Sequence, residues 1–173
     1  MTSKERIYAF LDAQNLNLGV REQGWVLDLK KFRIYLENKY KVDKAFFFIG
    51  YIKHNSSFYK FLHRVGYTVV FKPTIIQSKG KRKIIKGNVD AELVLHSMIE
   101  YGNYDKAIIV TGDGDFHCLI DYLQEKNKLL KLFIPNKKSF SALLRKFYPS
   151  MVFLNALKRK VVKRKRKAIP RYG

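Results

Sequence analysis

Acidic residues are scarce in this chain. Only 14 of its 173 residues are Asp or Glu, against 35 Lys and Arg, and the formal net charge is +21. Such a charge favours a polyanionic partner, of which nucleic acid is the commonest and an anionic membrane surface the second. The basic character is not confined to one end: segment 158–173 holds nine basic residues, and the remaining 26 still outnumber all the acidic ones.

Cysteine, long apolar runs and several common motifs are missing too. The single cysteine, Cys118, excludes an intrachain disulfide framework and a cysteine-based zinc site, and we expect it to be a small buried residue. No apolar stretch reaches the roughly 18 residues of a membrane helix, so we expect no membrane span. The opening MTSKERIYAFLDAQNL lacks the features of a signal peptide, which predicts a cytoplasmic protein. Walker A, HExxH and dinucleotide-binding patterns are also absent.

Apolar residues, in contrast, are plentiful, with 13 Phe and 11 Tyr, enough for the core of one domain. Short apolar runs alternate with segments of helical spacing. Strands are predicted at 7–11, 44–51, 67–72, 106–111, 129–134 and 151–154, and helices at 29–40, 56–65, 88–101, 116–126 and 139–147. This alternation predicts an α/β fold, a three-layer α/β/α sandwich with a mostly parallel, Rossmann-like central sheet.

Two basic segments stand out from this pattern. Residues 73–87 read as an inserted hairpin with a basic tip, and residues 158–173 read as a disordered basic tail, which leaves 1–157 as the domain. Both are expected to contact phosphates without reading sequence. The residues expected to do so are Lys79, Lys81, Arg82, Lys83, Lys86, Lys163, Arg164, Lys165 and Arg166.

Aspartates follow two of the predicted strands. Asp12 ends the run IYAFLD, and Asp113 and Asp115 lie in VTGDGDF. Because right-handed crossovers bring all parallel strand ends to one edge, where ligands bind, we expect Asp12 and Asp113 to lie together. In the same turn, Gly112 and Gly114 would permit unusual backbone angles.

A carboxylate cluster at that edge would suit Mg²⁺ or Mn²⁺. Two carboxylates as close as Asp113 and Asp115 repel each other unless a cation lies between them. Asp90 opens a predicted helix on a mostly apolar face, where a carboxylate needs a partner. Oxygen ligands are those that Mg²⁺ prefers, and a bound ion can activate water and neutralise phosphate charge.

Structural roles are open for the same aspartates. Asp12 can cap the turn or helix that follows it, and Asp115 can cap the helix starting at Phe116. Asp90 can pair with Lys86 or lie favourably at the positive end of the helix dipole. Glu92 and His96, one turn apart, are expected to form a solvated pair.

Three segments in this order, FLDAQNL, KGNVDAEL and VTGDGDF, resemble the NYN domains, specifically the LabA-like (DUF88) group of PIN-like nucleases. The resemblance covers about residues 5–155. It implies a PIN-like α/β/α sandwich with a divalent-metal ribonuclease site. The site residues that it implies are the acidic Asp12, Asp90, Asp113 and Asp115 and the supporting polar Asn15 and Thr111.

The chain departs from the family pattern at three positions. Thr111 and Gly114 stand where the family motif usually has serines. His96 stands where many members have a second acidic residue, six positions after the helix-start aspartate, which weakens the case for a second metal ion. PIN-like domains often pair, so the resemblance also implies a homodimer.

The leading hypothesis is a Mg²⁺- or Mn²⁺-dependent endoribonuclease, in which Asp12 and Asp113 are metal ligands and Asp90 and Asp115 complete the site. The substrate is RNA, with single-stranded DNA left open because no base-reading motif is present. The first alternative is a nucleic-acid-binding module without catalysis. The second is a basic interaction protein that binds a ribosome-like or anionic membrane surface through its tail.

Overall fold

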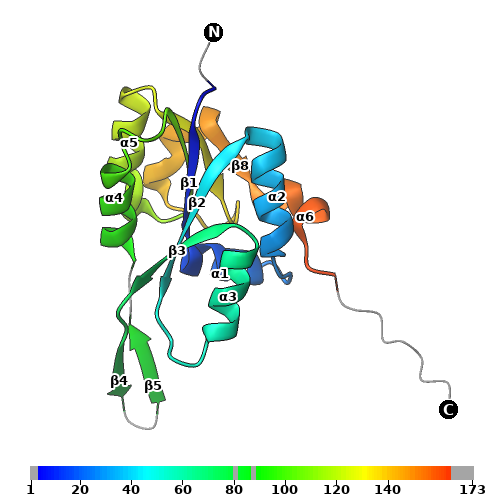
Figure 1. Ribbon diagram of the computed structural model, residues 1–173, viewed down its shortest axis with the longest axis vertical. Helices are drawn as coiled ribbons and strands as arrows, with labels where there is room; N and C mark the ends of the chain where they lie inside the picture. Colours follow the sequence, from blue (N-terminus) through cyan, green and yellow to red (C-terminus); the bar gives the residue numbers. More distant parts are fainter. Residues whose placement is uncertain (1–3, 80–81, 87–88, 165–173) are drawn as a thin grey trace, which may run out of the picture.

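A six-stranded parallel sheet forms the centre of the molecule (Figure 1). The computed structural model describes residues 4–79, 82–86 and 89–164. Along the sheet the strand order is β3-β2-β1-β6-β7-β8, and each neighbouring pair is parallel. The strands are β1 (Ile7–Asp12), β2 (Val42–Gly50), β3 (Tyr67–Lys72), β6 (Lys106–Val110), β7 (Leu129–Ile134) and β8 (Met151–Phe153).

Helices cover both faces of this sheet. One face packs against α1 (Ala13–Arg21), α2 (Leu29–Tyr40), α3 (Ser56–Arg64) and α6 (Leu154–Val161). The other packs against α4 (Asp90–Ile99), α5 (His117–Glu125) and the 3-10 helices η1 (Gly114–Phe116) and η2 (Ala142–Ser150). The three-layer sandwich expected from the sequence is therefore confirmed.

The continuous apolar runs of the strands follow from this double cover. In β1, Leu11 belongs to the core beneath α1, whereas Tyr8 and Phe10 belong to the core beneath α4 and α5. Phe10 stacks on Phe46 of β2 with ring centroids 5.3 Å apart. A strand buried on both faces needs apolar side chains at every position, which hides the period-two alternation of a half-exposed strand.

The inserted hairpin is present as an antiparallel pair, β4 (Ile75–Lys79) and β5 (Arg82–Lys86). It projects from the body of the fold at the edge of the sheet where β1 ends (Figure 1). Of the hairpin residues expected to contact phosphate, Lys81 lies outside the described residues, and only the backbone is described for Lys79, Arg82, Lys83 and Lys86. Asn88, the first residue of the helix predicted at 88–101, also lies outside the described residues, and α4 begins at Asp90.

Several local expectations differ from the structure. Cys118 is exposed rather than buried, because it lies on the outer side of α5. The helix expected at 139–147 is the 3-10 helix η2, with Pro149 near its end. Helix α1, which directly follows Asp12, was not expected. None of the helices in the described part of the chain has the length and apolar content needed to cross a membrane.

The C-terminal boundary lies later than the sequence indicated. Residues from 158 onward were expected to form a disordered tail, but α6 runs to Val161, and Val162 forms a bridge with Leu27. Leu154, Leu157 and Val161 are buried in the core beneath α2. Their spacing is helical, and the high density of Lys and Arg between them hid this signal. Of the tail residues expected to contact phosphate, Lys165 and Arg166 lie outside the described residues.

Replacing Val161 with Ala should lower the free energy of unfolding by about 2 kcal/mol, because the side chain is completely buried. Arg159→Ala is the matched control: its side chain is exposed on the same helix, so the change should stay within about 0.5 kcal/mol. Urea denaturation of both variants checks the difference. Equal effects would show that α6 does not pack on the domain.

Candidate metal centre

The candidate site lies where the strand order reverses. From β1 the chain proceeds outward through β2 and β3, and then returns to β6 on the other side of β1 and proceeds through β7 and β8. Leu11 pairs with Val110, so Asp12 and Thr111, the next residues, leave the sheet side by side. Such a point is where open α/β sheets bind their ligands.

A short hydrogen-bond chain ties the two strand ends together. The Thr111 hydroxyl donates to Asp12 Oδ2 at 3.2 Å and accepts from the Asp113 backbone N–H at 3.1 Å. Asn15 donates its backbone N–H to Asp12 Oδ1 at 3.2 Å, and its Oδ1 accepts from the Gly112 N–H at 2.7 Å. Asn15 and Thr111 therefore hold Asp12 and the turn that carries Asp113 in place.

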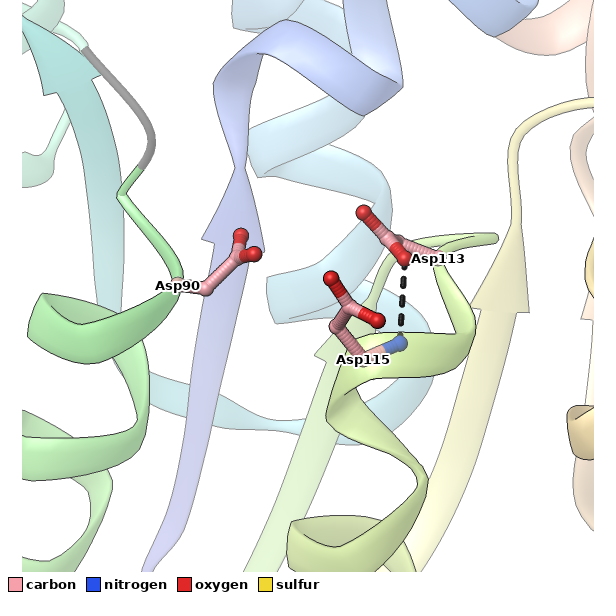
Figure 2. Close-up of side chains that lie close together, drawn as sticks. All are labelled: Asp90, Asp113 and Asp115. Carbon is pink, nitrogen blue, oxygen red and sulfur yellow. Dashed lines mark hydrogen bonds between the residues drawn. The ribbon is translucent and has the colours of Figure 1, made fainter.

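Three carboxylates converge beside this chain of hydrogen bonds (Figure 2). Asp90 comes from the start of α4, Asp113 from the loop after β6 and Asp115 from η1. One oxygen of each lies within 4.8 Å of the others. Oxygens bound to one Mg²⁺ at about 2.1 Å can be at most about 4.2 Å apart, so small side-chain rotations would let these three share an ion. The all-oxygen donor set fits Mg²⁺ or Mn²⁺.

Asp12 lies next to this trio but outside it. Its side chain is only 4% exposed, and both of its oxygens accept hydrogen bonds. Burial above all, and then the charges of Asp90 and Asp113, raise the pKa of Asp12 to about 6, although the hydrogen bonds from Asn15 and Thr111 act to lower it. A cation at the trio would lower this pKa, because it would offset both the burial and the like charges.

Of the two capping roles that the sequence left open, the structure shows that of Asp12 and not that of Asp115. Asp12 does cap a helix, since it accepts the Asn15 N–H at the start of α1, and this role coexists with its place at the site. Asp115 does not cap α5; instead Asp113 accepts the Asp115 N–H at 3.0 Å and caps η1. Because Asp113 occupies the N-cap position, its carboxylate orientation is fixed by the backbone of the next turn.

His96 and Glu92 do not pair with each other as expected. The His96 ring lies 5.7 Å from the Phe48 ring, and Glu92 forms an ion pair with Lys72 at 3.2 Å. The position where the family pattern often carries a second acid therefore holds a ring packed on an aromatic side chain. The described carboxylates of the site are thus those of Asp12, Asp90, Asp113 and Asp115.

The glycines of the GDGD turn serve close packing rather than unusual backbone angles. Neither Gly112 nor Gly114 has a positive φ, so the turn does not use the backbone freedom that glycine permits. A Cβ at position 114 would lie 2.9 Å from Ser141 Cβ, and one at position 112 would lie 3.3 Å from Phe140 Cβ. Ser141 also donates its N–H to the Gly112 carbonyl at 3.0 Å. No pattern in the sequence predicted this contact between distant segments.

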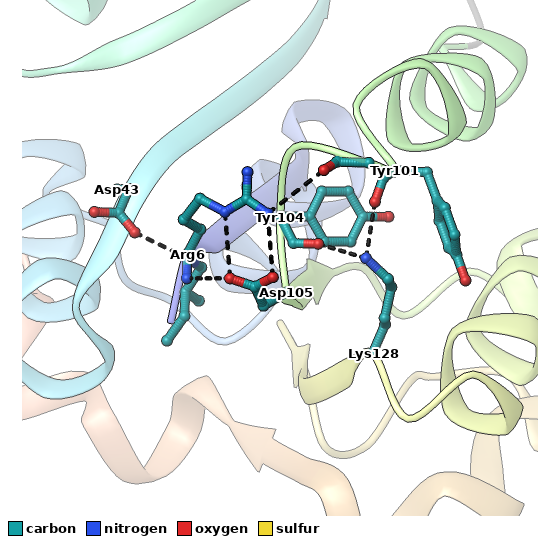
Figure 3. A network of polar contacts seen from close by, with 8 residues as sticks. Arg6, Asp43, Tyr101, Tyr104, Asp105 and Lys128 are labelled. Carbon is teal, nitrogen blue, oxygen red and sulfur yellow. Dashed lines mark hydrogen bonds and ion pairs between the residues drawn. The ribbon is translucent and has the colours of Figure 1, made fainter. Parts of the chain in front are cut away.

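At the opposite edge of the sheet, acidic residues are paired with basic ones (Figure 3). Asp105 accepts from the Arg6 backbone N–H at 2.7 Å and from its guanidinium at 3.2 Å, and Asp43 accepts from Lys4 at 2.8 Å. These bonds hold the pKa of Asp105 and that of Asp43 below their usual range. In the part of the chain that the structure describes, neither Asp113 nor Asp115 has such an ion pair.

Comparison with known proteins bears on this arrangement. The NYN domain model matches residues 6–155. The low amplitude and bright protein LabA of Synechococcus elongatus is 27% identical over 128 residues, which are 70% of this chain and 69% of that protein. The crystal structure of VPA0982, a Vibrio parahaemolyticus protein of unknown function, superposes with a TM-score of 0.74 and 26% identity. That match covers 94% of this chain and 100% of the Vibrio chain.

Gly114→Ala should lower the free energy of unfolding by about 1–3 kcal/mol and disturb the aspartate turn, because the added methyl group collides with Ser141. Gly102→Ala is the control, since a Cβ there would meet no atom within 4 Å. Chemical denaturation measures both. If the two variants are equally stable, the contact between the turn and η2 is not as tight as described.

Metal binding should stabilise the protein more at pH 7 than at pH 5. Asp12 holds its proton more tightly in the fold than in the unfolded chain, so its ionisation between about pH 4 and about pH 6 destabilises the metal-free protein. Above about pH 6 this loss of folding free energy is complete, and a bound cation can offset it. Melting temperatures with Mn²⁺ and with chelator, at both pH values, test this.

Asp121→Asn is the control for the same experiment, because its carboxylate pairs with Lys146 at 2.7 Å away from the aspartate trio. This variant should keep the full shift with Mn²⁺, whereas Asp113→Asn should lose most of it. A shift of the same size at pH 5 and pH 7 would contradict the role assigned to Asp12.

Proposed function

The chain belongs to the NYN domain family of PIN-like nucleases, and on this basis we propose that it is a divalent-metal-dependent endoribonuclease. One observation carries the proposal: Asp90, Asp113 and Asp115 converge at the switch point of the sheet, beside a buried Asp12. Carboxylates this close repel one another, and a bound cation would relieve that repulsion.

The trio would hold a single Mg²⁺ or Mn²⁺ ion. When bound, the ion lowers the pKa of a water ligand and neutralises charge on the scissile phosphate. Asp113 is fixed by its cap to the Asp115 N–H, and Asp90 enters from the first turn of α4. Asp12, held by Thr111 and Asn15, supplies negative charge behind the trio without needing to reach the ion. His96 on Phe48 adds no oxygen ligand, which supports one ion rather than two.

Basic residues on either side would hold the phosphate backbone. The hairpin strands carry Lys79, Arg82, Lys83 and Lys86, and the segment after α6 carries Lys163 and Arg164. Contacts of this kind give affinity that depends on salt and carry no sequence information. RNA is the substrate that the family membership favours. A cytoplasmic location and pairing with a second copy stay predictions.

Asp113→Asn should reduce Mn²⁺-dependent RNA cleavage by at least about 100-fold while keeping the fold, because Asn can still cap η1 but brings no charge to the ion. Asp121→Asn, prepared in the same way, should cleave like the wild type. End-labelled RNA and DNA strands, incubated with Mn²⁺, with Mg²⁺ and with chelator, provide the measurement.

Three outcomes separate the hypotheses. Internal cleavage of RNA that needs metal and Asp113 supports the proposal. Tight RNA binding without cleavage under any metal condition would favour the non-catalytic binding module. Cleavage that survives in Asp113→Asn would contradict the assignment of the site, or reveal a contaminating nuclease if chelator leaves it unchanged.

A further inference from the structure

A pocket of about 820 Å³ opens beside the aspartates, between α1, the segment before α2, the end of β2 and α3. Its volume is within the range of about 300–1,000 Å³ that is usual for sites of small organic ligands. Ala13 and Val89, the chain neighbours of Asp12 and Asp90, both line it. Phe48, which pairs with Asp12 in the sheet, lines it too. The pocket is therefore adjacent to the candidate metal centre.

The walls of the pocket are largely apolar and aromatic. Of its aromatic lining residues, Phe47 and Phe48 on β2 are buried, whereas Phe58 and Phe61 on α3 are only half-buried. The rings of Phe58 and Phe61 lie nearly parallel, with an interplanar angle of 21° and centroids 6.4 Å apart. Half-exposed aromatic rings at the wall of a pocket are the platforms on which unpaired bases stack.

The rim of the pocket is positively charged and has amide groups. Arg21, Lys30 and Lys163 line it, and the one acidic residue of the lining, Asp28, is engaged in capping α2 through the Lys31 N–H at 3.1 Å. A purely hydrocarbon ligand would have no charged group to pair with the basic rim. An anionic ligand with a flat apolar portion satisfies both the rim and the walls.

Three side-chain amides complete the lining, those of Gln14, Asn17 and Asn55. Gln14 and Asn17 are exposed on α1, and the Asn55 side chain makes no capping bond at the start of α3. Each amide offers both donors and an acceptor, which are the groups that pair with the edges of nucleobases.

We propose that this pocket takes an unpaired nucleobase of the nucleic-acid chain whose phosphate lies at the aspartate trio. The inference rests on the proposed nuclease function, since it places the phosphate at the metal centre, but it concerns a separate binding step. A base inside a duplex is stacked on both faces and cannot enter. The nucleotide beside the scissile phosphate must therefore be unpaired and turned out of any stack.

The test measures binding rather than cleavage, with the full chain in chelator. A short RNA carries an abasic residue at one position at a time, and its affinity is measured by fluorescence anisotropy. One position should lose affinity about tenfold, because stacking and pocket contacts disappear there. The remaining positions should show only the small changes expected of phosphate contacts.

Variants connect that position to the pocket. Phe58→Leu keeps apolar volume but removes the ring, so it should weaken the intact RNA about fivefold to tenfold and abolish the abasic effect at the sensitive position. Tyr122→Leu, at an exposed aromatic residue of α5 outside the pocket, is the matched control and should change neither quantity. Thermal melting of both variants verifies that they are folded.

The outcomes distinguish this inference from the nuclease proposal. Abasic positions that all behave alike, an abasic effect that persists in Phe58→Leu, or no RNA binding would each overturn the pocket assignment, whatever the cleavage assay shows. If the abasic effect is confined to one position and depends on Phe58, but the protein cleaves no RNA, the pocket assignment is supported and the proposed nuclease function is contradicted. Binding of an amphipathic peptide or fatty acid that Phe58→Leu weakens, while RNA affinity is unchanged in that variant, would assign the pocket to another ligand.

Discussion

The parallel pairing of β1 with β6 is the constraint on which the candidate site depends. These strands meet at the reversal of strand order, and their register leaves Asp12 and Thr111 adjacent at the sheet edge. The Thr111 hydroxyl then joins them by donating to Asp12 while accepting from the Asp113 N–H. Neither half of the sheet carries the site alone, because Asp12 and Asp113 come from strands that lead to opposite sides.

The few acidic residues of the fold lie in two kinds of surroundings. At one edge, Asp43 is paired with Lys4 and Asp105 with Arg6, and these ion pairs link the starts of neighbouring strands. At the other, carboxylates gather against one another, and burial raises the pKa of Asp12 to about 6. The first arrangement stabilises the metal-free fold and the second opposes it. Such a local conflict is typical of functional sites, where stability is given up for binding.

The sequence predicted the parts of this structure that follow from local pattern and topology. Strand ends located Asp12 and Asp113 at one edge, and the run 67–72 matched β3. The sequence did not predict contacts between segments that lie far apart along the chain. The role of Gly114 depends on Ser141 approaching from η2, and α6 depends on Val161 reaching the core. The sequence allowed Asp115 to cap the helix starting at Phe116, but α5 has no side-chain cap, and it is Asp113 that caps η1.

The β-bridge between Leu27 and Val162 has a consequence for the order in which the site is assembled. It holds Lys163 at the pocket formed by α1, β2 and α3. A ribosome makes the chain from its N-terminus, so all four aspartates emerge well before Lys163 does. During synthesis the carboxylate cluster thus precedes the last wall of the pocket.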